Sequence, residues 1–151
     1  MTTQLQLEIN KVDAEKIRSL RHSELRKGQD FSTTSLLKDY EEGTFHMACI
    51  VDENIVTCAT FYPEKFIKIK SDNAYRLRGM ATDSNFQRKG YATDLMGESF
   101  KELKNRDCDM VWCNARLVAV DFYKSVGFNI IGEIFDIEAI GPHYYMYKEI
   151  D

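Results

Sequence analysis

Hydrophobic and polar residues alternate over several short segments of the chain, a pattern typical of half-buried β-strands. Four such segments lie in the first part of the sequence: Leu5–Ile9, Thr44–Val51, Ile55–Tyr62 and Tyr75–Thr82. The polar turn Asp52–Asn54 joins the second to the third and predicts a hairpin. Gly79 lies inside the fourth and indicates a bulge there.

Other segments repeat their apolar residues at helical spacing. A first helix is predicted from Ala14 to Leu25 with Asp13 as its N-cap, and a second, short helix from Ser32 to Tyr40. A third begins near Ala92 and ends near Asn105. A fourth runs from Arg116 to Val126, where Gly127 is a natural C-cap.

Three further strands complete the order of elements: Met110–Cys113, Phe128–Phe135 and His143–Lys148. The last two are expected to pair with each other. The strands on either side of the third helix should form a parallel pair, because their connection is a helix. We therefore expect a mixed α/β fold, with a central twisted sheet of six to seven strands flanked by about four helices.

The composition is that of one ordinary globular domain, expected to span residues 1–151. No apolar run approaches the length of a membrane span, and the first residues lack a signal-peptide pattern. We therefore expect a cytoplasmic protein with no membrane partner. The four cysteines lie in apolar surroundings without a Cys-x-x-Cys pair, which favours reduced, buried thiols and no metal site.

The net charge of −4 argues against a nucleic-acid partner. Between residues 65 and 89, however, basic residues outnumber acidic ones: Lys65, Lys68, Lys70, Arg76, Arg78, Arg88 and Lys89. This distribution indicates either a site for a small anion or a solvated charged surface.

The segment Gln87–Ala92 connects the strand at 75–82 to the third helix. Backbone N–H groups of such a loop and of the helix N-terminus face the same place and favour a bound phosphate. Arg88 and Lys89 add full positive charges. The alternative is an ordinary strand–helix turn with two solvated basic side chains.

Three motifs resemble the GCN5-related N-acetyltransferase (GNAT) superfamily. Gln87-Arg88-Lys89-Gly90-Tyr91-Ala92 is similar to its Gln/Arg-x-x-Gly-x-Gly/Ala signature, with alanine where many members have the last glycine. Met80-Ala81-Thr82 matches the strand segment before that signature. Asn114 followed by Ala119-x-x-Phe122-Tyr123-x-x-x-Gly127-Phe128 matches a later region. The resemblance covers about residues 5–148 and implies the GNAT fold.

The resemblance also implies acetyl-coenzyme A as the cofactor, whose acetyl group moves directly to a primary amine of a small molecule or peptide. The residues it implies for cofactor binding are Met80, Ala81, Thr82, Gln87, Arg88, Lys89, Gly90, Tyr91, Ala92, Thr93, Asn114, Ala119 and Phe122. Coenzyme A carries a pyrophosphate that suits the loop donors. Its pantetheine arm can pair with the edge of the Met80–Thr82 strand, and the Met80 N–H is in the position that polarises the thioester carbonyl.

Tyr123 matches the tyrosine that acts as general acid toward the departing thiolate, and its alternative role is packing. The general base is not identified by the motifs: the strand before the loop lacks the glutamate of many members, so Glu64, His143 and a water chain remain open. His143 has the alternative role of a strand-end histidine. Arg21 and Arg26 either face the acceptor or are solvated.

Asn114 either contacts the pantetheine arm or forms a turn, and Phe122 either packs beside the cofactor or belongs to the core. Two other functions are weighed against catalysis. One is a module that binds acetyl-coenzyme A without turnover. The other is a binder of a different nucleotide, for which the acidic residue expected about 20 residues after the glycine loop is not well placed and the strand–helix repeat is short. The acceptor and the oligomeric state stay open, although family members often form homodimers.

Overall fold

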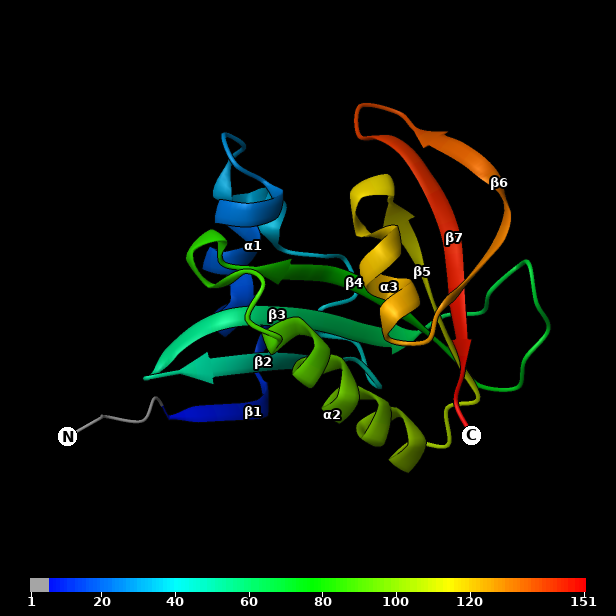
Figure 1. The fold of residues 1–151 in the computed structure, drawn as a ribbon, viewed down its shortest axis with the longest axis horizontal. Coiled ribbons are helices and arrows are strands. Elements are labelled where there is room, and N and C mark those ends of the chain that lie inside the picture. Colours follow the sequence, from blue (N-terminus) through cyan, green and yellow to red (C-terminus); the bar gives the residue numbers. More distant parts are fainter. Residues whose placement is uncertain (1–5) are drawn as a thin grey trace. The chain divides into compact units, whose positions relative to one another are not determined.

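The computed structural model describes residues 6–151, and Figure 1 shows its elements. Seven strands are present in this range: β1 (Leu7–Val12), β2 (Phe45–Val51), β3 (Asn54–Pro63), β4 (Ala74–Thr82), β5 (Met110–Arg116), β6 (Asn129–Ile137) and β7 (Gly141–Glu149). Three α-helices accompany them: α1 (Arg18–Leu25), α2 (Tyr91–Asn105) and α3 (Val120–Ser125). Four short 3-10 helices lie at Ala14–Ile17, Phe31–Thr34, Ser84–Phe86 and Leu117–Ala119.

The strands form one mixed sheet in the order β1-β2-β3-β4-β5-β7-β6. β4 and β5 run parallel, and α2 connects them, as expected for a strand–helix–strand unit. β7 pairs antiparallel with both β5 and β6. The predicted mixed α/β fold, its parallel pair and the pairing of the last two strands are therefore confirmed.

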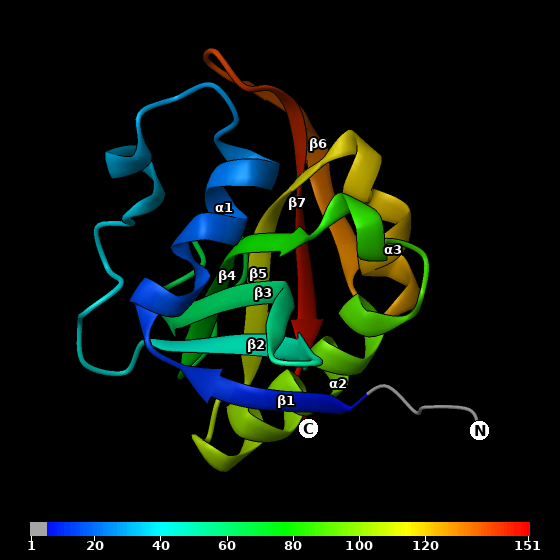
Figure 2. The ribbon, with the colours of Figure 1, turned by 90° about the vertical axis from the view of Figure 1, so that its left-hand side faces the viewer.

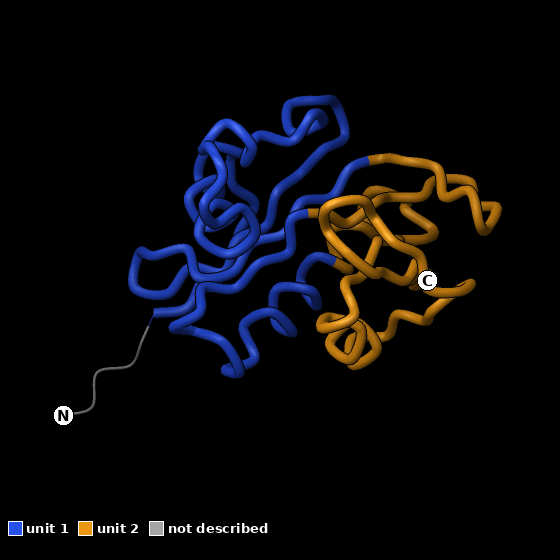
Figure 3. The backbone as a smooth tube through the Cα atoms, turned by 90° about the horizontal axis from the view of Figure 1, so that it is seen from above, with its two compact units in different colours: residues 1–62, 79–99 blue, residues 63–78, 100–151 orange. Residues whose placement is uncertain are grey.

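The chain divides into two compact units, which Figure 3 shows in different colours. Unit 1 contains residues 1–62 and 79–99, and unit 2 contains residues 63–78 and 100–151. Both β4 and α2 begin in one unit and end in the other. The expectation of a single domain over residues 1–151 stays a prediction.

In unit 1, β1, β2 and β3 form an antiparallel meander. Positive φ angles of 47° at Asp52 and 71° at Glu53 make the tight β2–β3 turn, the geometry of a type I′ hairpin. α1 and the 3-10 turn before it pack on one face of β2, β3 and the end of β4 (Figure 2). The residues of that contact are buried and small or aliphatic: Ile17, Leu20, Ala48, Cys58 and Ala81.

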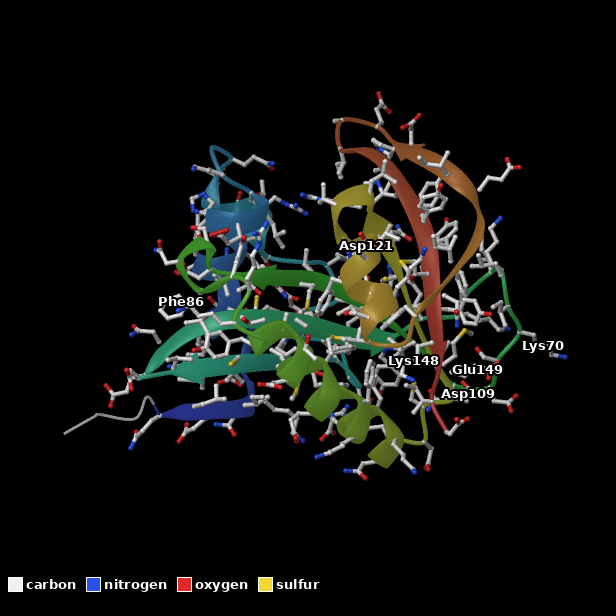
Figure 4. All side chains as sticks on the ribbon, viewed as in Figure 1. Lys70, Phe86, Asp109, Asp121, Lys148 and Glu149 are labelled. Carbon is white, nitrogen blue, oxygen red and sulfur yellow. The ribbon has the colours of Figure 1, made fainter. Side chains whose placement is uncertain are left out.

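In unit 2, an aromatic cluster fills the space between β5, β7 and the segment that precedes β4. The rings of Phe66 and Trp112 stack at 4.7 Å, and Tyr145 meets both edge-on. Asp109, labelled in Figure 4, holds the same segment by accepting hydrogen bonds from the backbone N–H groups of Asp72 and Asn73. These contacts fix the start of β4 and β5, where the parallel pairing lies.

The helices differ from the sequence prediction at three places. The first predicted helix is a 3-10 turn before Arg18 and an α-helix after it, and the fourth begins as a 3-10 turn before Val120. The predicted helix at 32–40 is wrong, and residues 31–34 form a 3-10 turn instead.

Leu5, the predicted start of the first strand, lies outside the described residues.

Local hydrogen bonds explain the missing helix at residues 32–40. Asp30 accepts a hydrogen bond from the Ser32 N–H through its carboxylate and one from the Thr33 hydroxyl through its carbonyl. The Thr34 hydroxyl donates to the Phe31 carbonyl at 2.7 Å. Short polar side chains thereby satisfy the backbone in a turn, which competes with helix formation.

Candidate functional site

The loop between β4 and α2 is anchored at its entrance. The Asp83 carboxylate caps the 3-10 turn by accepting from the Asn85 N–H at 2.9 Å. The Ser84 N–H donates to Glu24, the penultimate residue of α1, at 3.1 Å. Phe86, labelled in Figure 4, lies 6.3 Å from the ring of Tyr91. The anchors leave residues 87–90 exposed between two fixed ends.

The exposed part of this loop is shaped to gather backbone donors. Arg88 has φ 61° and Gly90 has φ 84°, both in the left-handed region. Left-handed residues in a short loop can turn neighbouring N–H groups toward one side, an arrangement that favours an anion. No atom lies within 4 Å of the place where a Cβ of Gly90 would stand, so the approach to the backbone is open.

The N-terminus of α2 continues this donor surface. The Gly90 carbonyl accepts the first intrahelical hydrogen bond, from the Asp94 N–H at 3.0 Å. The N–H groups of the first three helical residues, Tyr91, Ala92 and Thr93, therefore have no carbonyl partner within the helix. With Arg88 and Lys89, the loop and helix start offer a positively polarised place for a phosphate.

The β4 residues predicted to meet the cofactor follow Gly79 directly. Gly79 has φ 64°, the left-handed conformation that a glycine bulge uses, which is consistent with the bulge predicted there. Ala81 is buried, whereas Met80 and Thr82 are half-buried. Half-buried and buried residues therefore alternate at the carboxyl end of β4.

Unit 2 holds the second group of predicted site residues. The pairs between β4 and β5 run from Ala74–Met110 to Arg76–Trp112, and Asn114 lies beyond the last of them. The Asn114 Oδ1 is buried and, within residues 6–151, has no hydrogen-bond partner. Such an acceptor costs free energy unless a ligand or water donates to it. Asn114 is therefore suited to receive an amide N–H of a bound group.

Tyr123 lies on α3 and is 6% exposed. Its ring packs against Phe122 at 5.4 Å and Phe128 at 5.3 Å. Burial raises the pKa of Tyr123 well above its usual value, the charge of Cys113 adds to this shift, and Arg116 opposes it. The hydroxyl therefore keeps its proton at neutral pH. Both predicted alternatives, acid and packing residue, are compatible with this environment.

Two other residues of the predicted set lie near Tyr123 in sequence. Ala119 ends the 3-10 turn that leads into α3, and Phe122 is half-buried on α3. The structure thus divides the predicted cofactor residues between the units. Those from β4 and the loop belong to unit 1, and those from β5 to α3 belong to unit 2.

The two candidate side-chain bases are both engaged in structural contacts. The Glu64 carboxylate accepts from Arg76 at 2.9 Å, and Arg76 also lies over the Trp112 ring. His143 is 3% exposed, and its Nδ1 lies 2.8 Å from the Gly141 carbonyl. Because a carbonyl only accepts, Nδ1 carries the proton and His143 is held in one orientation.

The basic residues between 65 and 89 do not act as one set. Five belong to unit 2 and two, Arg88 and Lys89, belong to unit 1. In unit 2, Arg76 is paired with Glu64, and Lys68 lies over the ring of Tyr145. The two loop residues are the exposed members that accompany converging backbone donors.

Arg21 is neither solvated nor exposed to an acceptor: its side chain is buried and paired with the Asp39 carboxylate at 2.7 and 3.0 Å. Arg26 follows α1 and donates to the Leu25 carbonyl at 3.1 Å. Sequence reasoning singled out Arg21 and missed its partners. Asp39 stands in a polar segment without a motif, so no sequence signal linked it to a helix 18 positions earlier.

All four cysteines are buried free thiols, which confirms that prediction. Burial raises the pKa of Cys49 and of Cys108 to about 11. Within residues 6–151, no three or more His, Cys, Asp or Glu side chains gather as metal ligands. No helix in the same range is long and apolar enough to cross a membrane.

The chain belongs to the Acetyltransferase (GNAT) family, because the profile of that family matches residues 14–128. A protein of Bacillus subtilis (strain 168) named Uncharacterized N-acetyltransferase YitI is 33% identical over 144 residues. The match covers 95% of this chain and 97% of that protein. The predicted family and the predicted class of enzyme, an N-acetyltransferase, are therefore confirmed.

Solved structures support the same fold at low sequence identity. An aminoglycoside 6′-N-acetyltransferase complexed with coenzyme A matches with a TM-score of 0.77 and 14% identity, over 95% of this chain and 97% of that one. The ribosomal-protein-S18-alanine N-acetyltransferase from Escherichia coli matches with a TM-score of 0.72 and 17% identity, over 97% of this chain and 95% of that one. Their names show that this fold serves both small-molecule and protein acceptors.

Proposed function

We propose that this N-acetyltransferase moves the acetyl group of acetyl-coenzyme A directly to a primary amine of a small molecule or peptide. The observation that carries the proposal is the exposed loop at residues 87–90, whose left-handed residues and helix start gather donors beside two basic side chains. A pyrophosphate matches this set of donors in charge and in hydrogen-bonding capacity.

The orphaned Asn114 oxygen supports the same cofactor. Coenzyme A has amide N–H groups along its pantetheine arm, and a buried acceptor without a partner favours such a donor. The half-buried strand residues Met80 and Thr82 offer backbone groups for the same arm. When bound, acetyl-coenzyme A supplies the activated thioester.

The residues of the chain then divide the work of transfer. The Met80 N–H is the proposed donor to the thioester carbonyl oxygen, where negative charge develops. Tyr123 is the proposed donor of a proton to the leaving sulfur, and its raised pKa keeps that proton available. Ala119 and Phe122 are proposed to line the cofactor site beside it.

Proton removal from the amine is assigned to water. Neutralising a lysine-like amine at pH 7 costs about 4–5 kcal/mol, so a proton acceptor is required. Glu64 already pairs with Arg76, and His143 is only 3% exposed, so its Nε2, the ring nitrogen that could accept a proton, has little access to an amine. The observed contacts therefore favour a water chain over either side chain.

We also propose a cytoplasmic location, because four buried free thiols suit a reducing compartment. The enzyme thus shares a compartment with soluble amine acceptors, and no membrane or nucleic-acid partner is proposed.

The test is release of the coenzyme A thiol from acetyl-coenzyme A against a panel of amines, polyamines, amino acids and peptides. We expect saturable release with at least one primary amine and none with its N-acetylated form. Calorimetry with coenzyme A gives an independent measure of the cofactor site. Binding without thiol release from any acceptor would contradict the proposed acetyl transfer and leave only a binding site.

A further inference from the structure

Two buried side chains of unit 1 contact the β4 bulge from the face covered by α1. One is Arg21 of α1, and the other is Cys58 of β3. Neither side chain belongs to the predicted cofactor site. Both lie at Gly79, the residue immediately before Met80.

Arg21 is immobilised by four hydrogen bonds. Its two terminal nitrogens donate to the Asp39 carboxylate, to the Thr34 carbonyl at 2.8 Å and to the Thr60 hydroxyl at 2.6 Å. Its remaining nitrogen, Nε, stands 3.3 Å from where a Cβ of Gly79 would be. The guanidinium therefore lies close to the bare Cα of Gly79, and an added Cβ would force it to move by a few tenths of an ångström.

A second hydrogen-bond chain fixes the Arg21 partners. The Nε2 of His46 lies 3.0 Å from the Asp39 carbonyl, so Nε2 is the donor and Nδ1 is left as an acceptor. Nδ1 lies 2.8 Å from the Thr60 hydroxyl. Thr60 therefore donates to His46 while it accepts from Arg21, and burial lowers the pKa of His46, which keeps the ring neutral.

Cys58 contacts the peptide group that follows the Gly79 Cα. Its thiol is fully buried and donates to the Gly79 carbonyl, with 3.6 Å between Sγ and the oxygen. Burial raises the pKa of Cys58 to about 12, and the nearby Arg21 charge and the Ala81 backbone N–H oppose the shift. The sulfur thus stays a thiol and keeps the proton that it donates.

The Gly79 carbonyl and the Met80 N–H belong to one peptide group. A hydrogen bond accepted by the carbonyl polarises that group and makes its N–H a better donor. The hydrogen bond also limits rotation of the peptide plane about the φ and ψ bonds that flank it. A contact at Gly79 therefore acts on the Met80 N–H.

We propose that Cys58 and Arg21 are positioning residues that orient and polarise the Gly79–Met80 peptide for its role as carbonyl donor. Cys58 does so through the hydrogen bond to the Gly79 oxygen, and Arg21 by packing on the Gly79 Cα. The role of the Met80 N–H rests on the function proposed above, whereas the effect of Cys58 on this peptide does not.

The first test uses the protein without cofactor. In Cys58→Ala, the ¹⁵N resonance of Met80 should shift more than those of other β4 amides, and its amide hydrogen should exchange faster. Cys58→Ser should restore both values, because serine again donates. Cys49→Ala is the matched control, because it removes the same atoms from an equally buried cysteine. Cys49 follows Ala48 on β2, so its side chain points to the face of the sheet opposite to α1. A Met80 signal unchanged in Cys58→Ala, or equally changed in Cys49→Ala, overturns the proposal.

The second test uses bound acetyl-coenzyme A labelled with ¹³C at its carbonyl. The infrared carbonyl frequency should move toward that of the free thioester in Cys58→Ala and return in Cys58→Ser. With any active acceptor, kcat should fall about five-fold in Cys58→Ala, the factor expected from one ordinary hydrogen bond, with KM for acetyl-coenzyme A unchanged. An unchanged kcat and carbonyl frequency would contradict the proposal.

The two proposals fail in different ways. If the parent protein releases no thiol with any amine, the proposed transfer fails, while the Met80 resonance still decides whether Cys58 acts on the peptide. If the parent is active and Cys58→Ala matches it in every readout, only the positioning role fails.

Discussion

At the scale of single residues, the Tyr123 side chain is buried, and burial raises the pKa of its hydroxyl. If it is the general acid, Tyr123→Phe should lower kcat about 100-fold, the usual size of one acid–base contribution. The dissociation constant of coenzyme A, measured by calorimetry, should stay the same, because the ring and its packing against Phe122 and Phe128 are kept.

The control for this substitution is Tyr62→Phe, which removes the hydroxyl of another buried tyrosine, in unit 1. It should leave kcat unchanged. Equal rates for Tyr123→Phe and the parent would assign Tyr123 to packing alone.

The pH dependence of turnover follows from the direction of the same shift. The pKa of Tyr123 lies above its usual value near 10, so its acidic form is fully populated through neutrality and is lost only above about pH 10. Between about pH 7 and 9, loss of the Tyr123 proton should therefore not lower kcat. The parent and Tyr123→Phe should show the same pH dependence of kcat in this range. A fall that disappears in Tyr123→Phe would mean that another environment surrounds the hydroxyl during turnover.

Gly90 permits a matched comparison within unit 1. Gly90→Val places a branched side chain at φ 84° over the loop donors, so we expect coenzyme A to bind at least ten-fold more weakly (about 1.4 kcal/mol). Gly28 has φ 81° and equally open surroundings but lies away from the loop in sequence. Gly28→Val should cost similar stability and leave the affinity intact; calorimetry of both variants distinguishes strain from obstruction.

The sequence predicted those site residues that a local motif carries. The loop donors depend on neighbouring residues, so Gln87–Thr93 were recognisable from one glycine, two basic residues and a helix start. The environment of Arg21 was not, because its partners come from positions 34, 39 and 60, and pairing at such separations depends on the folded chain. The orphaned state of the Asn114 oxygen likewise depends on burial.

At the scale of elements, the Arg21–Asp39 pair ties the segment after α1 to the sheet. Residues 26–44 contain only one short 3-10 turn, so this buried pair and the His46 contact to the Asp39 carbonyl hold the segment in place. Asp39→Ala should lower the free energy of unfolding by about 3–5 kcal/mol, because it leaves a buried guanidinium unpaired.

Urea denaturation measures this loss, with Glu102→Ala as its control. Glu102 on α2 pairs with Arg106, the residue that follows the helix, and both side chains are partly exposed. That substitution should cost less than about 1 kcal/mol. Similar losses in the two variants would mean that the buried pair contributes no more than a surface one.

The same pair predicts how stability changes in acid. Burial alone would raise the pKa of Asp39, but the hydrogen bonds from Arg21 and the Leu36 N–H outweigh it and lower that pKa below its usual value. A lowered carboxyl pKa stabilises the fold above the unfolded value near 3.9, and this stability is lost as pH falls below it. Asp39→Asn should flatten the loss of unfolding free energy between about pH 5 and 3; an equal slope would contradict the assignment.

Elements whose apolar residues repeat at regular spacing could be predicted from the sequence. Segments whose conformation depends on hydrogen bonds from short polar side chains could not. α2 was predicted to end near Asn105 and does so, because apolar residues repeat at helical spacing along it: Ala92, Leu95, Met96, Phe100 and Leu103. The predicted helix at 32–40 failed because the Thr33 and Thr34 hydroxyls and the Asp30 carboxylate satisfy the backbone locally. The 3-10 starts before α1 and α3 keep nearly the same side-chain spacing as a helix, so periodicity did not reveal them.

At the scale of the whole molecule, the class of fold followed from the order of strands and helices, whereas the division into two units did not. Hydrophobic patterning marks which face of an element is buried, but it does not say which elements share a compact unit. β4 changes unit between Arg78 and Gly79, and the sequence signal at this place, a glycine inside a strand, predicts a bulge and not a boundary between units.

Deleting β7 tests the organisation of unit 2. β7 lies between β5 and β6 and pairs with both, so its loss leaves two strands without a common partner. Removal of residues 141–151 should abolish the dispersed aromatic signals of Phe66, Trp112 and Phe135 in NMR spectra. Removal of Asp151 alone, an exposed residue after the strand, should leave them unchanged.

The interior position of β7 also constrains how the protein is made. A ribosome delivers the chain from its N-terminus, so β5 and β6 emerge before the strand that joins them. Unit 2 therefore cannot complete its sheet until β7 (Gly141–Glu149) has left the exit tunnel, and until then the facing edges of β5 and β6 have unpaired backbone groups. Tyr123 and Asn114 therefore belong to a finished unit only after β7 has emerged and paired with both strands.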